Sequence, residues 1–541
     1  SEAASAPSSR GDRPTPASGR PTDTAVLPGT VLAMVQARLE RLPPGARRIL
    51  RAASVFGTRF WMGGVAALVG ADAVDNVRET LADLVQREVV MHSPSSRYQD
   101  DAEYTFRHIL VRDAAYEMLT ERDRKVAHLL AAEWLEARGE REAIVLAEHL
   151  DRSGEAQRAV VWYLWAAEQA LEGNDLARVL VRTERGIACG AQGVTLGELY
   201  LLRAEASGWT GHATHLELAE KALGLLPSGS AAWARAAAEL AVAWRSMGDR
   251  ARLRDAATKL ASMASPDMSL GHAWGIARTV VELLGAGESA LTEQLIPSIA
   301  DATARAEEGD VATFNAMVEW LRGATALYAG VPGPISARAA EIATTFEAAG
   351  HVRYGALVAL HGAVAAAAVG EWASGVSWAE RAADSARRLG LRSYELRARA
   401  WLAYHLARSG LGDIALATAL SVVRDSGDDR VAGGEGHVHL AHIHLMNHDL
   451  DAAHAAASVV WADPAYSADA RGRAGELLAH LLLVRDRPLE AVATAHAALD
   501  LLEQAKPLGD AAVRRTLDEA RRRLDQKIDE TSRGGETSAP S

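Results

Sequence analysis

The sequence predicts an all-α fold, an α-α superhelix of repeated helix pairs preceded by a small module with one β-hairpin. Hydrophobic residues make up 49% of the 541 residues but aromatic residues only 5%, as expected for packed helices rich in Ala and Leu. Turn-forming residues recur at nearly constant spacing over most of the chain, and two short extended segments lie near its start. The chain is too long for one compact core, so several domains or a repeat array are expected.

Changes in composition and periodicity divide the chain into six segments. The first is rich in Ser, Pro, Ala and Gly, and we expect a disordered linker that follows a further, upstream partner domain. The last is rich in Ser, Gly and Thr and is expected to fray. The segments are a linker (1–26), a winged-helix-like module (27–112), connecting helices (113–154), the superhelix (155–509), a capping helix (510–527) and a disordered tail (528–541).

The module at 27–112 is expected to contain helices followed by a hairpin. Helices are predicted after Pro43-Pro44 and at 62–68 and 74–84, and extended segments at 88–92 and 104–107. This order describes a winged-helix module. The buried face of the second helix is predicted to carry Ile49, Leu50, Ala53 and Val55.

The charge of the chain argues against nucleic-acid binding. The net charge is −12, and the helix before the predicted wing, 71–88, carries five acidic residues against two arginines. Such a helix repels the phosphate backbone, which binds clustered Lys and Arg. A structural, protein-facing role is the better hypothesis for this module.

The superhelix is predicted from internal periodicity, because turn-like residues recur every 37 to 43 residues. About nine helix-turn-helix units follow. The second helix of each unit carries a similar phrase with small residues, for example Ala256 and Ala257 after Gly248, which let stacked helices approach closely. The predicted turns lie at Gly173, Gly211, Gly248, Gly287, Gly330, Gly370, Gly410, His448 and Asp486.

Cysteine content and hydropathy favour a soluble, cytoplasmic protein. Cys189 is the only cysteine, which excludes an intramolecular disulfide and a cysteine-based metal site. No continuous apolar run reaches the ~18 residues of a membrane span, and the start of the chain lacks a signal-peptide profile. No membrane association is expected.

The helix-turn-helix periods and Ala-rich second helices resemble the tetratricopeptide superfamily over about 155–526. The units are longer than the usual ~34 residues, as in the divergent variant found in large bacterial regulators.

A second resemblance lies upstream, in a series of phrases that occur in a fixed order. Together they look like the segment that follows the nucleotide-binding core in bacterial signal-transduction ATPases with numerous domains, which occur with adenylate-cyclase, serine/threonine-kinase or LuxR-type partners. The resemblance implies a parent with an upstream ATPase core that uses ATP or ADP and magnesium. The phrases are Leu27-Pro28-Gly29-Thr30-Val31, Ala37-Arg38-Leu39-Glu40-Arg41-Leu42, Ala52-Ala53-Ser54-Val55-Phe56-Gly57, Tyr104-Thr105-Phe106-Arg107-His108, Arg112-Asp113-Ala114-Ala115-Tyr116 and Leu146-Ala147-Glu148-His149-Leu150.

No motif for catalysis occurs in the sequence. It has no Gly-x-x-x-x-Gly-Lys-Ser/Thr phosphate loop, kinase set, Gly-x-Ser-x-Gly elbow or His-Glu-x-x-His motif. We therefore expect no enzyme, no catalytic residue and no cofactor within this segment.

Two residues are candidates for nucleotide contact, by the resemblance to these ATPases. His108, and with less support Arg107, is implied to touch nucleotide held by the absent ATPase core. The alternative is that Phe106 fills the core while Arg107 and His108 cap or pair locally.

Histidines and tryptophans of the repeats are better explained by packing. The cluster of six histidines between His437 and His454 lacks a matching ligand helix, so satisfied core histidines are favoured over a metal site. Most tryptophans, including Trp274, Trp320 and Trp401, are expected to be wedges between helices, with one or two lining a groove.

The leading hypothesis is a sensor arm whose concave repeat surface binds a protein, a peptide or a small inducer and shifts the upstream ATPase between states. One alternative is an interaction scaffold without nucleotide-linked switching. Another is a transcriptional regulator whose DNA contact is made elsewhere in the parent.

Overall fold

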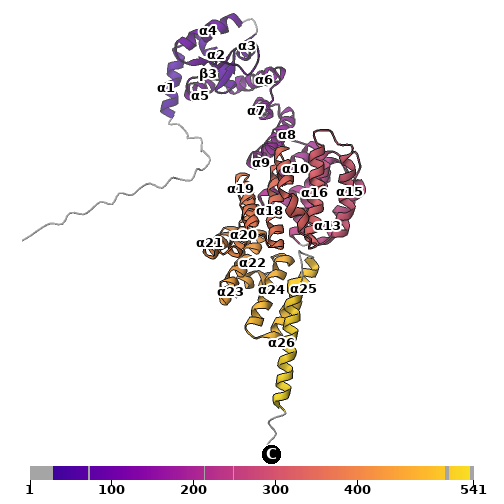
Figure 1. Ribbon diagram of the computed structural model, residues 1–541. Coiled ribbons are helices and arrows are strands. Elements are labelled where there is room, and N and C mark those ends of the chain that lie inside the picture. Colours follow the sequence, from indigo (N-terminus) through magenta and orange to yellow (C-terminus); the bar gives the residue numbers. More distant parts are fainter. Residues whose placement is uncertain (1–28, 71–73, 212–213, 248, 506–510, 536–541) are drawn as a thin grey trace, which may run out of the picture. The chain divides into compact units, whose positions relative to one another are not determined.

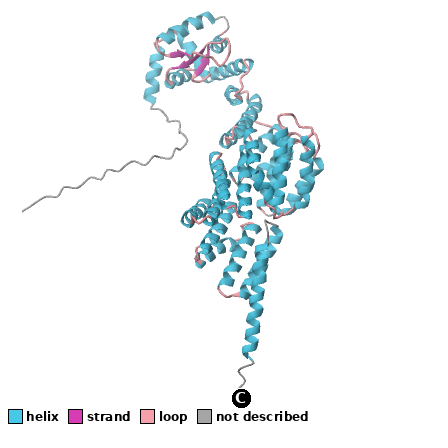
Figure 2. Cartoon of the chain, in the orientation of Figure 1, coloured by secondary structure: helices cyan, strands magenta, loops and turns pink. Residues whose placement is uncertain are grey.

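The computed structural model describes residues 29–70, 74–211, 214–247, 249–505 and 511–535 (Figure 1). In these ranges the chain forms 26 helices and three short strands (Figure 2). It divides into two compact units. The N-terminal unit comprises the chain up to Arg141 with Glu148–Glu155, and the repeat unit comprises Glu142–Ala147 with everything from Ala156 onward. The predicted linker at 1–26 lies outside the described residues.

The N-terminal unit contains helices around a small sheet. Its second helix follows Pro43, and Ile49, Leu50, Ala53 and Val55 are buried on it as predicted. The elements are α1 (Gly29–Glu40), α2 (Pro44–Val55), β1 (Arg59–Trp61), α3 (Met62–Val69), α4 (Val74–Gln86), β2 (Val90–His92), β3 (Glu103–Phe106), α5 (Ile109–Glu117), α6 (Glu121–Ala137) and α7 (Ala143–Ser153), of which α7 contributes to both units.

The sheet has one strand more than the predicted hairpin. β2 and β3 pair antiparallel with Val90 opposite Phe106, as expected, and β1 pairs with the other side of β3. With three residues directly before α3, β1 is too short to show the alternation by which a strand is recognised. The first extended segment also begins later than predicted, because Glu88 adopts a left-handed φ of 56° after α4.

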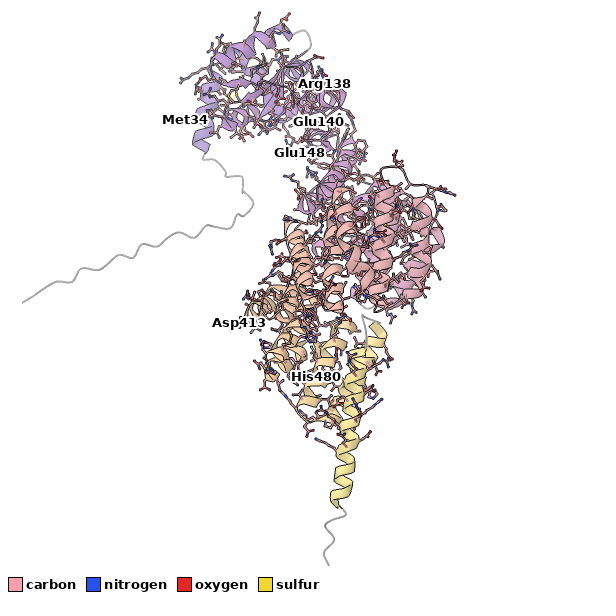
Figure 3. The ribbon with its side chains drawn as sticks, viewed as in Figure 1. Met34, Arg138, Glu140, Glu148, Asp413 and His480 are labelled. Atoms are coloured by element: carbon pink, nitrogen blue, oxygen red, sulfur yellow. The ribbon has the colours of Figure 1, made fainter. Side chains whose placement is uncertain are left out.

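The helices predicted as a separate connecting segment belong largely to the N-terminal unit. α5 packs on α1 and α2, and α6 packs on α3. The indole of Trp134 on α6 stacks on that of Trp61, with 5.8 Å between ring centroids. Glu140 follows α6 (Figure 3). Its carboxylate accepts hydrogen bonds from Arg97 at 2.6 Å and Tyr98 at 2.5 Å.

The repeat unit consists of nine consecutive helix pairs in the described residues. The first helices of the pairs are α8 (Ala156–Glu172), α10 (Gly193–Thr210), α12 (Ala231–Ser246), α14 (Leu270–Ala286), α16 (Val311–Tyr328), α18 (Val352–Val369), α20 (Arg392–Arg408), α22 (Arg430–Met446) and α24 (Ala468–Val484). The second helices are α9 (Leu176–Ala188), α11 (His215–Leu225), α13 (Arg250–Met263), α15 (Ser289–Thr303), α17 (Gly333–Ala348), α19 (Trp372–Arg388), α21 (Gly412–Ser426), α23 (Leu450–Ala462) and α25 (Pro488–Ala505).

The predicted turns separate the two helices of each pair. Gly248 lies outside the described residues, and each of the other eight positions follows a first helix. Most adopt the left-handed conformation that ends a helix, as Gly287 does at φ 76° and His448 at φ 61°. After α8 this conformation is taken by Asn174, one residue beyond the predicted Gly173.

First helices form a continuous inner layer of the repeat unit. From α10 to α24, each first helix contacts the first helix of the next pair as well as its own partner. The chain also returns on itself, because α10 contacts α20. The fold is thus an all-α superhelix of helix pairs, as the sequence predicts.

The last helix is longer than predicted. α26 runs over Ala511–Gly535, whereas a disordered tail is expected from residue 528. The segment Gln526–Glu530 contains good helix formers and no Gly or Pro, so the helix continues through the predicted boundary. Leu517 and Ala520 are its buried residues, which is consistent with a cap on the last pair.

One described helix has the length and hydropathy of a membrane span. It is α18, with a mean hydropathy of 1.5, and 61% of it is buried within the repeat unit. Contacts with α17 and α19 account for this burial, as in the core helix of an array.

Candidate functional site

Four aromatic side chains from four first helices meet in the interior of the repeat unit. Trp209 of α10 lies 5.6 Å from Tyr354 of α18 and 5.3 Å from Tyr394 of α20, measured between ring centroids. Trp274 of α14 stacks on Tyr354 at 3.9 Å. Helices from distant pairs therefore share one aromatic cluster, which we call the interior cluster.

Two arginines lie against the same indole of the interior cluster. The guanidinium carbon of Arg278 on α14 is 4.3 Å from the centroid of Trp209, and that of Arg353 on α18 is 5.8 Å away. Such contacts are favourable cation–π interactions. Arg278 is only 2% exposed, whereas Arg353 is half-buried at the rim of the cluster.

All three guanidinium nitrogens of Arg278 and one of Arg353 lack acceptors among the described residues. The Nε, Nη1 and Nη2 atoms of Arg278, Nη1 of Arg353 and the indole Nε1 of Trp274 are all buried without a hydrogen-bond partner. Buried polar groups in proteins are almost always hydrogen-bonded. Arg278 has three such atoms, more than any other described residue, which makes the interior cluster the candidate site.

The carboxylates around the interior cluster are engaged elsewhere. Glu205 accepts two hydrogen bonds of 2.7 Å from Arg235, and Glu282 accepts one of 3.3 Å from Arg245. Glu239 Oε2 lies 2.8 Å from the Nε2 atom of His215. Glu239 and Glu282 act on Arg278 through their field. Burial raises the pKa of Tyr354 to about 12, so its hydroxyl stays protonated.

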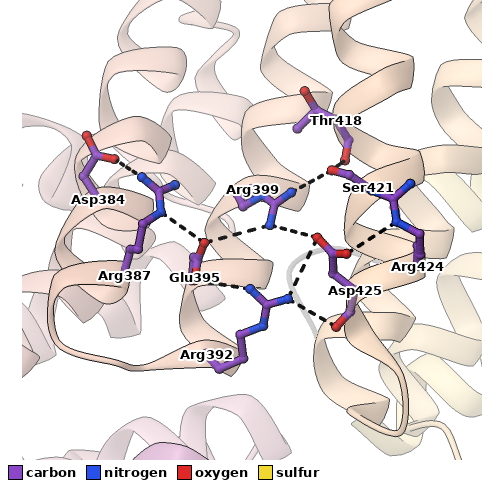
Figure 4. A network of polar contacts seen from close by, with 9 residues as sticks. All are labelled: Asp384, Arg387, Arg392, Glu395, Arg399, Thr418, Ser421, Arg424 and Asp425. Carbon is purple, nitrogen blue, oxygen red and sulfur yellow. Dashed lines mark hydrogen bonds and ion pairs between the residues drawn. The ribbon is translucent and has the colours of Figure 1, made fainter. Parts of the chain in front are cut away.

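A second polar cluster shows how the array satisfies arginines elsewhere. Between α19, α20 and α21, Arg399 contacts Ser421 at 2.7 Å and Asp425 at 3.3 Å, and Arg387 bonds Glu395 at 3.2 Å (Figure 4). Arg392 joins Glu395 to Asp425. Every arginine drawn there has a carboxylate partner, in contrast to Arg278.

The histidines of α22 and α23 have separate partners. His439 is buried against Trp401 at 4.4 Å, and His437 Nδ1 bonds the carbonyl of Gly433 at 2.8 Å. His444 lies near Asp449, and His454 bonds Ser458. In the described ranges, no three His, Cys, Asp or Glu side chains are placed to hold a metal ion.

His108 and Arg107 lie at the start of α5, away from any cluster of this kind. His108 is the exposed N-cap residue of α5, and its side chain makes no capping bond. Arg107 forms an ion pair of 3.3 Å with Glu88. Phe106 is buried in the core and Arg107 pairs locally, as the alternative expects. Nucleotide contact stays a prediction for both His108 and Arg107.

Sequence reasoning missed Arg278, Arg353 and Trp209. The available signal was a single cation in a stretch of α14, Ile276–Leu284, that is apolar apart from Thr279 and Glu282. Trp274, Trp320 and Trp401 are buried wedges as predicted. Which tryptophan faces the interior depends on contacts between distant pairs, and periodicity does not report them.

Comparisons with known proteins leave the family open. No protein-family model matches the chain, and no curated protein matches it. Among solved structures, a signal transduction ATPase with numerous domains and a tetratricopeptide repeat sensor from Pyrococcus horikoshii aligns at 12% identity and a TM-score of 0.40, over 93% of this chain and 68% of that chain.

Two further structures align in the same range. The Rap protein complexed with competence and sporulation factor aligns at 11% identity and a TM-score of 0.39, over 68% of this chain and 99% of that chain. Yeast Tom70 aligns at 13% identity and a TM-score of 0.25, over 76% of this chain and 97% of that chain. These scores are too low to transfer any function.

Proposed function

We propose that this chain is the non-catalytic ligand-binding arm of a larger bacterial signalling protein in the cytoplasm. The interior of the repeat unit binds a peptide, a protein segment or a small inducer, and an upstream ATPase core responds. The observation that carries the proposal is the interior cluster, where a buried guanidinium lacks an acceptor among the described residues.

The position of the interior cluster makes it suitable for a switch. It joins α10 to α18 and α20 through Trp209, so a ligand seated there changes contacts between pairs that are distant in sequence. A ligand shifts a conformational equilibrium only through contacts that differ between the two states. Contacts that open or close a turn of the superhelix meet this requirement.

The N-terminal unit is proposed to connect this arm to the ATPase core as a winged-helix-like module. ATP or ADP with magnesium would be held by the core and would supply the phosphate charge. His108 is exposed at a helix N-terminus, a position that favours anions, so it fits contact with a phosphate. Arg107 is engaged by Glu88 and would have to leave that carboxylate first.

The test compares ADP release from the longer parent protein carrying Trp209→Phe or Trp165→Phe. Trp209 is buried in the interior cluster, whereas Trp165 on α8 is 46% exposed and serves as the matched control. We expect W209F to change the release rate about fivefold or more and W165F to leave it unchanged.

Circular dichroism checks that both variants are folded. Release rates equal to wild type in both variants would contradict the switch and leave the scaffold alternative. A parent without a phosphate loop upstream would contradict the ATPase partner itself.

A further inference from the structure

We infer that the interior cluster is a carboxylate-binding site in which Arg278 is the anchoring residue. This inference rests on the proposed function and specifies the chemistry of its ligand. It is argued from the character of the unsatisfied groups, from the engagement of the nearby acids and from the exposure of the rim.

The unsatisfied atoms of the interior cluster are all hydrogen-bond donors. They comprise the three nitrogens of Arg278, Nη1 of Arg353 and Nε1 of Trp274. Guanidinium and indole nitrogens donate and do not accept. The group that completes them must therefore be an acceptor.

The protein does not offer that acceptor from the acids around the cluster. Glu205, Glu239 and Glu282 are bonded to Arg235, His215 and Arg245, respectively. Moving one of them to Arg278 would break the hydrogen bond to its present partner. Exchanging partners within the cluster would therefore not increase the number of satisfied donors.

A carboxylate fits this site better than a phosphate. The planar fork of a guanidinium matches the two oxygens of a carboxylate. Glu239 and Glu282 place negative charge near Arg278, and a phosphate dianion would be repelled more strongly than a monoanion. The aromatic walls formed by Trp209 and Tyr354 suit an organic ligand that carries the carboxylate.

The ligand has a direction of approach. Trp209 is 3% exposed and Arg278 2% exposed, whereas Arg353, Tyr354 and Tyr394 are half-buried. These three side chains are the more exposed members of the cluster, and we call them its rim. A carboxylate from solvent would reach the donors of Arg278 once these rim side chains rotate aside.

The missing hydrogen-bond partner of Arg278 should affect the thermal midpoint of the protein measured without ligand. A buried charge without a hydrogen-bonded partner destabilises the fold, and an apolar replacement of similar volume is often neutral or stabilising. Arg278→Met should therefore fold with an unchanged or higher thermal midpoint while it loses ligand. A structural arginine would show the opposite effect on the midpoint.

The experiment measures thermal midpoints of the 541-residue chain with four probes. They are a pool of random hexapeptides lacking Asp and Glu, the same pool with amidated C-termini, succinate, and inorganic phosphate. Isothermal titration calorimetry then measures the affinity of the stabilising probe. The matched control is Arg338→Met, since Arg338 is an exposed arginine paired with Glu319 and Glu341.

We expect the free-carboxylate pool or succinate to raise the midpoint of the wild type and of R338M. R278M should weaken the affinity about 30-fold or more, because the ligand carboxylate loses its charged partner. Arg353→Met, at the rim, should weaken the affinity for the same probe about tenfold. This second variant keeps the inference testable if R278M fails to fold. Stabilisation by the free pool identifies a peptide C-terminus as the source of the carboxylate, and stabilisation by succinate alone a small organic acid.

Other results overturn the inference. Phosphate binding as tightly as the carboxylates would contradict the ligand class, and full affinity in R278M would contradict the anchor. Equal binding of the amidated pool by wild type and R278M would leave the proposed function intact and remove the carboxylate site. No effect of any probe on the wild type would overturn both.

Discussion

The first and second helices of the repeat unit are built from similar residues but bury them differently. Fourteen of the seventeen residues of α14 are buried, against five of fifteen in its partner α15. α15 follows the usual pattern of one apolar face on a solvated helix. α14 buries Arg278 and Glu282 as well, so the inner layer contains polar groups that packing alone does not require.

This difference suggests a division of roles between the two layers of helices, one for packing and one for ligand binding. The second helices supply regular packing against the first. The first helices contact one another, and their buried polar residues are the ones that a ligand or a change of pH can reach. Three predictions test this division, in order of decreasing effect.

The largest effect is expected for tryptophan truncation in the inner layer. Trp320 on α16 is 0% exposed, and its indole donates a hydrogen bond of 3.1 Å to His361. Trp320→Ala should lower the free energy of unfolding by about 4 kcal/mol, the usual cost of removing a buried tryptophan. Urea denaturation followed by far-UV circular dichroism measures it.

The matched variant is Trp372→Ala on the second helix α19. Trp372 is half-buried and stacks on the guanidinium of Arg408 at 4.5 Å. Its truncation should cost about 1 kcal/mol, since an exposed cation–π contact contributes about that much. Equal costs for W320A and W372A would refute the distinction between the layers.

A smaller effect of opposite sign in the two layers is expected for glycine-to-alanine changes. A Cβ atom at Gly275 on α14 would lie 2.7 Å from the backbone of Ala234 on α12, so Gly275→Ala must push the helices apart. We expect a loss of about 2 kcal/mol in the free energy of unfolding, as for other overpacked cores.

Gly224 near the end of α11 serves as the comparison, because a Cβ atom there meets nothing within 4 Å. Gly224→Ala should raise the free energy of unfolding by roughly 0.5 kcal/mol through helix propensity. Thermal and urea denaturation of both variants give the sign. A stabilising G275A would contradict the close approach of α12 and α14.

The smallest effect concerns pH. Burial lowers the pKa of His361 on α18 from 6.5 to about 4. The unfolded chain therefore binds a proton that the folded chain does not bind between pH 6.5 and pH 4. The contribution of His361 is fully present above pH 6.5 and is lost as the pH falls, by about 1 kcal/mol between pH 7 and 5.5.

His361→Gln tests this contribution, because the glutamine carbonyl can accept the bond from Trp320 and does not titrate. The free energy of unfolding of H361Q should fall less between pH 7 and 5.5 than that of the wild type. Burial also lowers the pKa of the buried His128 and of the half-buried His442 to about 4, so part of the slope should persist in H361Q. An identical slope in both proteins would contradict a neutral His361.

Local signals were enough to predict most of the fold. Helices often end at a left-handed residue. Gly, His448 and Asp486 occur at such ends, so their spacing predicts the turns and the number of pairs. The sequence does not predict the strand β1, because a segment of three residues is too short to show a periodicity. The sequence places the end of α26 too early, because a polar segment rich in helix formers resembles a disordered tail in composition.

The candidate site could not be predicted in the same way. Arg278 looks like an ordinary helix residue until α10 and α20 are known to meet beside it. His108 was chosen from a resemblance, and its exposure at the start of α5 is compatible with that choice and does not test it. Contacts between distant pairs are set by the curvature of the superhelix, which accumulates from many small packing angles.

The contact between Trp209 and Tyr394 also bears on how the chain folds. Repeat arrays fold by growth from any pair to its neighbours, because nearly all their contacts are local. Here two rings at positions 209 and 394 must meet at 5.3 Å, which closes a loop of many helices. Closing a long loop costs entropy before its contact is made. Growth along the array and closure of the interior should therefore be separate kinetic phases, with the interior cluster assembled last.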